Sequence, residues 1–263
     1  MTRWAYGITT VPERRLDLVP RTMLSLIHGG FHTPHIFVDG VAEYPKCPAC
    51  QLTTRSKPLR TFGHWALSMA ELWIRNPACD RYAMFQDDFV CVRNLRQYLD
   101  RVEYPSKGYL NLLTFPSNET FLEEQGNETA NRIGFHESRE TNPGSSWQTG
   151  RGAVALVFSR EALMVLLTSR TFVERPMDAT QGHKRLDGCI VTAMNKAGWR
   201  EYIHNPSLVL HTGKRSSMGN KPHPHSKTFP GEEYDALDLL SANVPPHRAV
   251  MVGRVGTGAS AVV

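Results

Sequence analysis

Hydrophobic and polar positions along residues 4–38 form three blocks that predict a strand, a helix and a second strand. The first block (WAYGITTV, 4–11) is apolar and rich in β-formers, and it stops before a proline, as a buried strand would. Apolar residues then recur at helical spacing over 14–30, where a glycine pair closes the segment. A short apolar run (HIFV, 35–38) follows. This order is typical of a parallel sheet with crossover helices.

Similar blocks continue along the chain and predict an α/β domain with a mostly parallel central sheet flanked by helices. Residues 41–60 read as a loop with room for one strand, and the polar stretch 116–148 reads as a functional or mobile segment. We expect further strands at 81–86, 109–115 and 207–211, further helices at 63–76, 94–102 and 187–198, and a glycine turn, a strand and a helix within 150–167. The predicted domain covers 1–230, and 231–263 are expected to form a C-terminal helix and a flexible tail.

Length and composition agree with one such domain. The chain has 263 residues, of which 41% are hydrophobic, enough for a full core. No window approaches the roughly 18 consecutive apolar residues of a membrane span, and the N-terminus has no apolar stretch of signal-peptide length. We therefore expect a cytoplasmic protein that does not act in a membrane, either bacterial or in the host cytoplasm if viral.

The cysteines favour a reducing compartment over a disulfide framework. There are five, and they are scattered along the chain. Cys47 and Cys50 (CPAC) have the spacing of a zinc knuckle, but no second close pair would complete four ligands. A plain loop with two thiols is the favoured interpretation, and a structural zinc is the alternative.

The net charge of +5 is unevenly placed. Residues 205–227 contain three lysines, one arginine and three histidines and no acid. A segment of this kind suits an anion such as phosphate, with a solvated basic loop as the alternative.

Two adjacent carboxylates follow a strand that the pattern predicts to be buried. In YAMFQDDFVCV (82–92), an apolar run leads into Asp87 and Asp88 and then resumes. Because a buried anion is costly unless it is paired, these side chains either emerge into solvent or hold a cation. Other polar residues also stand at predicted strand ends, notably Asp39 and His211. Ligands of open α/β sheets lie beyond the carboxyl ends of the strands, and carboxylates with a histidine suit Mn²⁺ or Mg²⁺.

The order of these segments over roughly residues 4–218 resembles that of GT-A fold glycosyltransferases, which transfer a sugar from a nucleotide-sugar donor. ITTVPERR (8–15) is similar to the first-strand segment around the nucleotide base, and FVDG (37–40) to the end of the second strand. FQDDF (85–89) resembles the metal-binding DxD motif, and WQTGRGAVALVF (147–158) the glycine loop that lines the donor sugar.

The resemblance implies a role for individual residues. Asp88 and His211 would hold Mn²⁺ or Mg²⁺, since glutamine occupies the first position of the DxD motif. Asp187 would be the acceptor-side acid and general base, although Leu186 stands where a second acid usually precedes it, and an N-cap role for Asp187 is the simpler alternative. The implied donor contacts are Thr9, Thr10, Val11, Arg14, Asp39, Gln86, Asp87, Gly150, Gly152, Lys214 and Arg215.

The expected activity is a metal-dependent transfer from a nucleotide-diphosphate sugar, with uridine diphosphate (UDP) favoured by resemblance and inversion favoured over retention. Two acceptor classes stay open, a glycan and a hydroxymethylated base in DNA. The competing hypothesis is a binding module for nucleotide sugars or nucleic acid that keeps the fold with a degenerate site. The glutamine at position 86 is its main support.

Overall fold

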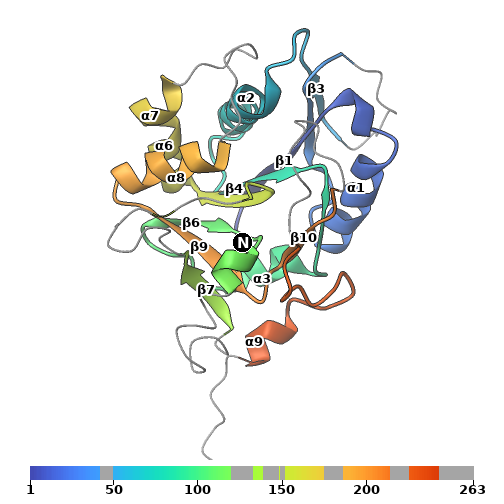
Figure 1. The fold of residues 1–263 in the computed structure, drawn as a ribbon, viewed down its shortest axis with the longest axis vertical. Helices are drawn as coiled ribbons and strands as arrows, with labels where there is room; N and C mark the ends of the chain where they lie inside the picture. The colour runs from blue at the N-terminus through green and yellow to red at the C-terminus, as the bar shows by residue number, and fades with distance from the viewer. Residues whose placement is uncertain are drawn as a thin grey trace, which may run out of the picture.

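The computed structural model describes residues 1–41, 50–119, 133–138, 148, 152–174, 186–213 and 225–242. Its centre is an eight-stranded sheet in the order β3-β2-β1-β4-β8-β6-β9-β7 (Figure 1). The strands are β1 (Trp4–Thr10), β2 (His35–Val38), β3 (Leu52–Thr54), β4 (Arg81–Gln86), β6 (Gly108–Asn111), β7 (Gly134–Glu137), β8 (Ala155–Ser159) and β9 (Arg200–Asn205). A two-stranded sheet pairs β5 (Phe89–Cys91) with β10 (Val209–His211).

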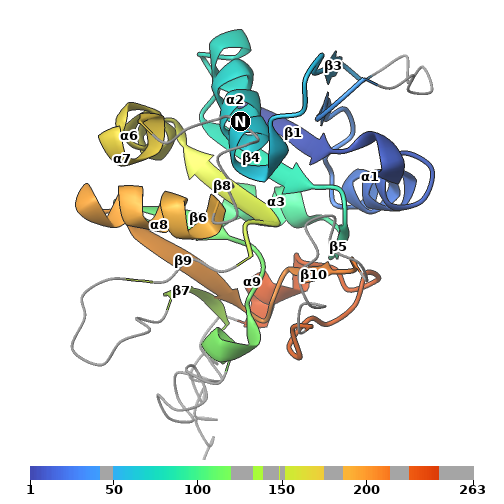
Figure 2. The ribbon, with the colours of Figure 1, turned by 45° about the horizontal axis from the view of Figure 1, so that its top comes forward.

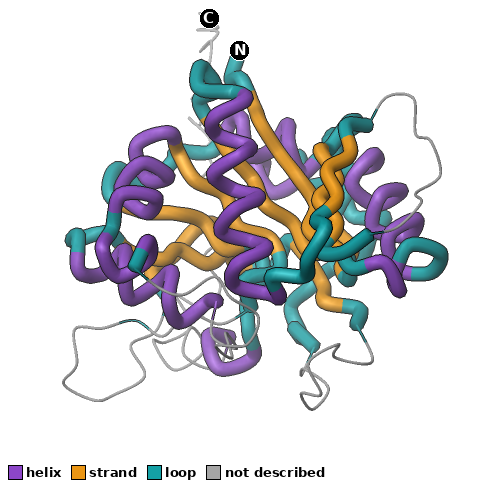
Figure 3. The backbone as a smooth tube through the Cα atoms, turned by 90° about the horizontal axis from the view of Figure 1, so that it is seen from above, coloured by secondary structure: helices purple, strands orange, loops and turns teal. Residues whose placement is uncertain are grey.

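Helices cover both faces of the large sheet (Figure 3). The helices are η1 (Pro12–Arg14), α1 (Leu18–His28), α2 (Arg60–Arg75), α3 (Leu95–Arg101), α6 (Arg160–Thr168), α7 (Arg170–Val173), α8 (Leu186–Lys196) and α9 (Asp238–Ala242). One hydrophobic core joins the sheet to α2, α6, α7 and α8. The other joins the opposite face to α1, α3, α9 and the small sheet. This layered arrangement confirms the predicted α/β architecture with a mostly parallel sheet.

Strand direction sets the edge at which a site can form. The strands β3, β2, β1 and β4 run parallel, β8 runs antiparallel between β4 and β6, and β9 is parallel to β6. The carboxyl ends of β1, β2, β4, β6 and β9 therefore meet at one edge, and β8 starts from that edge. Polar residues predicted at the ends of β1, β2 and β4 lie along it.

Three strands were not predicted from the hydrophobic pattern: β5, β7 and β9. The strand expected over 109–115 is shorter and ends at Asn111, although Leu112 N still donates to Ala155 O at 3.0 Å. In the small sheet, β5 and β10 bring residues from distant parts of the sequence side by side (Figure 2).

The segment 225–242 lies against the rest of the molecule. Glu119 is 4% exposed and accepts hydrogen bonds from Ser226, Lys227 and Thr228. Leu239 of α9 is 1% exposed within the core beside α3. The predicted division of the chain after residue 230 stays a prediction, and the expected tail after residue 242 is outside the described residues.

Candidate active site

Asp87 and Asp88 form the two-residue link between β4 of the large sheet and β5 of the small one. Both are buried, at 2% and 4% exposure, so the solvent-exposed alternative is wrong. The β5–β10 pairing places His211 opposite Phe89, and Thr212 N donates to Asp88 O at 2.7 Å. As a result, His211 Nε2 lies 3.3 Å from Asp88 Oδ2.

Arg14, at the end of η1, pairs with both carboxylates. Its Nη1 atom lies 2.6 Å from Asp87 Oδ1 and 2.9 Å from Asp88 Oδ2. Thr10 Oγ1 at the end of β1 donates to Asp87 Oδ2. The hydroxyl of Thr22 on α1 is within hydrogen-bond distance of Asp87 O, at 2.8 Å. The structure therefore brings together four residues of the predicted site, Thr10, Arg14, Asp87 and Asp88, with His211 beside them.

The two acids differ in how readily they ionise. Burial raises the pKa of Asp87 to about 6, although the charge of Arg14 opposes that effect. Burial acts on Asp88 in the same direction, but the hydrogen bond and charge of His211 and the charge of Arg14 outweigh it, so the pKa of Asp88 is lowered. Asp88 is thus ionised at neutral pH.

The surroundings of Asp88 fit a divalent cation with a partial set of protein ligands. Asp88 Oδ1 is buried and has no hydrogen-bond partner among the described residues. A Cβ atom at Gly213 would lie 2.7 Å from Asp88 Oδ2 and 2.9 Å from His211 Cε1, so a glycine keeps this space open. The described residues contain no group of three or more His, Cys, Asp or Glu that could hold a metal. A cation there would complete its shell with water and substrate oxygens, which is common for Mg²⁺.

The predicted glycine loop and the predicted base also meet. Gly152 N donates to Asp187 Oδ2 at 3.0 Å, from the turn before β8 to the first turn of α8. Beside them, Gln86 Nε2 donates to Ala153 O at 3.0 Å, so Gln86 ties the end of β4 to the same turn. Asp187 is half-buried and is the second residue of α8, which begins at Leu186. Its carboxylate contacts the turn before β8.

Asp39 has a structural role that the sequence did not predict. Its carboxylate accepts hydrogen bonds from Leu59 N at 2.6 Å and Arg60 N at 2.7 Å, at the start of α2. The predicted contact with a nucleotide base or ribose stays a prediction for this residue. Thr9, on the neighbouring strand β1, lies with its Oγ1 atom 3.3 Å from Phe85 O. Val11 is half-buried between β1 and η1.

A buried acid near Asp187 was missed. Glu201 on β9 is 2% exposed, and its Oε1 atom accepts hydrogen bonds from Tyr109 Oη and Asn111 Nδ2, each at 3.2 Å. Burial raises the pKa of Glu201 to about 7, and the charge of Asp187 adds to the shift. The segment REYIHN (200–205) gives little signal, because its two apolar residues, Tyr202 and Ile203, are adjacent and do not alternate with polar ones.

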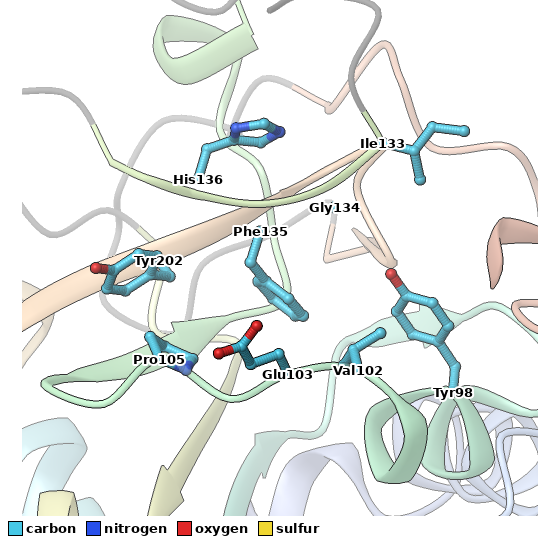
Figure 4. A pocket seen from close by; sticks show the side chains of 9 residues that line it. All are labelled: Tyr98, Val102, Glu103, Pro105, Ile133, Gly134, Phe135, His136 and Tyr202. Carbon is cyan, nitrogen blue, oxygen red and sulfur yellow. The ribbon is translucent and has the colours of Figure 1, made fainter. Parts of the chain in front are cut away.

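A separate hollow of about 540 Å³ lies between the loop after α3 and strands β7 and β9 (Figure 4). Phe135, Tyr202 and Glu103 line it, together with other residues of these elements, and the Glu103 carboxylate points into it. Among the predicted site residues that the structure describes, none lines this hollow.

Gly150, Lys214, Arg215 and Cys47 lie outside the described residues, so the predictions for them stay predictions. No helix in the described part of the chain is long and apolar enough to cross a membrane.

Comparison with solved structures supports the fold prediction. GalNAc-T7, solved with UDP, GalNAc and Mn²⁺, is similar with a TM-score of 0.54 and 9% sequence identity, over 83% of this chain and 45% of that chain. The catalytic domain of Drosophila β1,4-galactosyltransferase 7, solved with xylobiose, is similar with a TM-score of 0.41 and 13% identity, over 83% of this chain and 74% of that chain. This chain thus spans less than half of GalNAc-T7.

The first of these similarities confirms the predicted GT-A fold, and identity this low speaks to the fold alone. The second is too distant to add weight. No protein-family model matches the sequence, and no curated protein matches it.

Proposed function

We propose that the chain is a metal-dependent glycosyltransferase that moves a sugar from a nucleotide-diphosphate sugar to an acceptor hydroxyl. The observation that carries this proposal is the meeting of Asp88 and His211 across the β5–β10 pairing, at the carboxyl edge of a GT-A sheet. Ligands of open α/β sheets bind at that edge.

Asp88 and His211 are the residues that would hold Mn²⁺ or Mg²⁺. When bound, the ion would supply positive charge for the diphosphate leaving group. Thr10 and Arg14 lie next to the acids and extend the polar surface toward a donor. Uridine is the proposed donor base, by resemblance to the family; GalNAc-T7 was solved with UDP and Mn²⁺.

Asp187 is the proposed general base. Its Oδ2 atom accepts from Gly152 N, which orients the carboxylate and leaves Oδ1 to take the proton of the acceptor hydroxyl. As the proton moves, the acceptor oxygen bonds to the anomeric carbon, and the bond from that carbon to the diphosphate oxygen breaks with its electron pair. Attack from the face opposite the leaving group inverts the configuration.

A glycan hydroxyl is the proposed acceptor class. The alternative, a hydroxymethylated base in DNA, depends on basic residues such as Lys214 and Arg215, which are outside the described residues, and it stays a prediction. A degenerate binding module is the second candidate, because Gln86 contacts Ala153 O where the DxD motif has an acid. Slow, Mn²⁺-dependent hydrolysis of the donor separates an enzyme from a binding module.

The test is thermal unfolding with a panel of nucleotide sugars, with and without Mn²⁺. A ligand that binds only the folded state adds about 2.7 kcal/mol to the free energy of unfolding at one hundred times Kd, and therefore raises Tm. We expect one nucleotide to stabilise the protein more than the others, and only with Mn²⁺. The variant Asp88→Asn should lose most of this shift, and His211→Ala a smaller part. An undiminished Mn²⁺-dependent shift in Asp88→Asn would contradict the proposed metal site.

A further inference from the structure

We propose that Arg14 is an internal counter-ion that competes with the divalent cation for Asp88. Binding of the cation then requires the guanidinium to leave Asp88, and the departing group becomes available to the donor diphosphate. This inference rests on the proposed function, because it concerns the same metal site.

The geometry places Arg14 where two anions converge. A single nitrogen, Nη1, contacts Asp87 Oδ1 at 2.6 Å and Asp88 Oδ2 at 2.9 Å. The Arg14 side chain is 16% exposed, and those of the two acids are 3% and 6% exposed. A close, mostly buried contact of this kind is screened little by salt, so it contributes strongly to neutralising the acids.

The same oxygen also faces His211. Asp88 Oδ2 lies 2.9 Å from Arg14 Nη1 and 3.3 Å from His211 Nε2. A cation shared by Asp88 and His211 would have to approach this pair, and a guanidinium hydrogen bond already occupies the oxygen. A cation bound through the unpartnered Oδ1 atom would still lie within a few ångströms of the guanidinium, and like charges that close repel strongly in a buried site, so the cation and Arg14 compete for Asp88.

Asp87 gives Arg14 a place to remain after it leaves Asp88. The shorter of its two contacts is with Asp87, whose other oxygen is held by Thr10. Arg14 follows β1 on the short helix η1, at the edge where a donor would bind. A small rotation of the Arg14 guanidinium about its contact with Asp87 would therefore turn other N–H groups of Arg14 toward the donor diphosphate. A guanidinium group is well suited to phosphate oxygens.

This arrangement also explains how two adjacent acids stay buried before a cation binds. Removing one partner of a buried ion pair leaves an uncompensated charge, which is strongly destabilising. Arg14 supplies the compensating charge in the absence of the cation. The cation would take over that role at Asp88.

The test is direct binding of Mn²⁺ to the full chain without any nucleotide. Binding is measured as the loss of the electron paramagnetic resonance signal of free Mn²⁺. We compare the wild type with Arg14→Met and with Arg15→Met, a matched control. Arg15 is adjacent and exposed, so its substitution removes the same charge without touching either acid. Removing the competitor should tighten Mn²⁺ binding by about tenfold or more in Arg14→Met. Arg15→Met should stay within about twofold, because exposed charges are screened.

A second variant guards against misfolding of Arg14→Met, in which two buried acids lose their partner. Arg14→Lys keeps the charge on a shorter side chain, and its Mn²⁺ affinity should fall between those of the wild type and Arg14→Met. Unchanged or weaker Mn²⁺ binding in both variants, or none in any protein, would overturn the inference. Nucleotide-sugar binding by the wild type is measured separately by thermal unfolding. The glycosyltransferase proposal can therefore survive when this one fails.

Discussion

The hydrogen bond from Gly152 N to Asp187 Oδ2 determines, at the scale of single residues, what a substitution of Asp187 can reveal. An amide oxygen can accept the same bond, so asparagine preserves the contact between the turn and α8. It cannot take a proton from an acceptor hydroxyl. The two roles of this side chain, holding the turn and acting as a base, are therefore separable.

Asp187→Asn should reduce the rate of sugar transfer by roughly 10²–10⁴, the usual contribution of a positioned general base. Donor-induced stabilisation and Tm should stay close to those of the wild type. Steady-state transfer assays and thermal unfolding with donor measure the two effects. Glu174→Gln changes an exposed acid directly after α7; it is the control and should leave both unchanged.

Transfer at near wild-type rate in Asp187→Asn would show that this carboxylate serves only the fold. The base would then have to be sought elsewhere, first at Glu137 on β7 and at Glu140 and Asp178, which are outside the described residues. Loss of donor binding would instead place Asp187 in the donor-sugar pocket.

The sequence located polar residues at strand ends better than it predicted the partners of those residues. The Asp87–Asp88 pair was identified as either solvated or cation-binding, and the cation that pairs with it in the structure is Arg14. Local pattern could not predict this pair, because α1, β2, β3, α2 and β4 lie between the two partners in the sequence. Asp39 was likewise found at a strand end, but its contact with the start of α2 depends on the packing of α2.

At the scale of elements, the turn before β8 is held in a conformation that only glycine adopts readily. Gly152 has φ +72°, and a Cβ atom there would lie 2.7 Å from Leu113 Cδ2. Backbone strain and a steric clash therefore both disfavour any side chain at position 152. Gly198, just after α8, offers a comparison: its φ is +77°, and a Cβ atom would meet nothing within 4 Å.

Gly198→Ala should lower the free energy of unfolding by about 1 kcal/mol through strain alone. Gly152→Ala should lower it by roughly 1–3 kcal/mol more, because Leu113 must also move. Urea denaturation measures both. Equal losses in the two variants would mean that Leu113 yields freely. In that case the turn would be less constrained than its geometry indicates.

Of the strands that were not predicted, β9 is the one that carries a buried acid and a buried histidine. Its residues Glu201 and His204 are 2% and 0% exposed, and such residue types normally indicate a surface. The burial of these polar side chains depends on tertiary hydrogen bonds, from Tyr109 and Asn111 to Glu201 Oε1 and between Tyr98 Oη and His204 Nε2. Long, apolar segments such as β1 and β4 carry no such conflict, and they were predicted nearly to their bounds.

At the scale of the whole molecule, these two residues of β9 give opposite dependences on pH. The pKa of Glu201 is raised by burial to about 7 from 4.5, so its stabilising neutral form is lost as pH rises through that range. The pKa of His204 is lowered by burial to about 4 from 6.5, so stability is lost as pH falls through that range. Between about pH 4.5 and 6.5 the two effects oppose each other.

Glu201→Gln should remove the contribution of Glu201 to the pH dependence of stability and keep an oxygen at the Oε1 position that accepts hydrogen bonds. The variant should gain on the order of 3 kcal/mol over the wild type by pH 7 to 8, with the gain growing from about pH 4.5. Chemical denaturation at several pH values measures it. The control Glu137→Gln changes an exposed acid on the neighbouring strand β7 and should follow the wild type. A constant difference between Glu201→Gln and the wild type across this range would contradict a raised pKa.

The late position of β8 in the sequence leaves one side of β4 without its partner strand while the chain is being synthesised. Residues 4–86 already contain β1, β2, β3 and β4, which can pair as the ribosome releases them, whereas the partner on the other side of β4 begins only at Ala155. Until then β4 is an outer strand with an apolar run from Tyr82 to Phe85, and unpaired strands of this kind recruit other chains. Synthesis proceeds at about 5–20 residues per second, so the nascent protein carries this aggregation-prone edge for seconds, and chaperone demand should peak there.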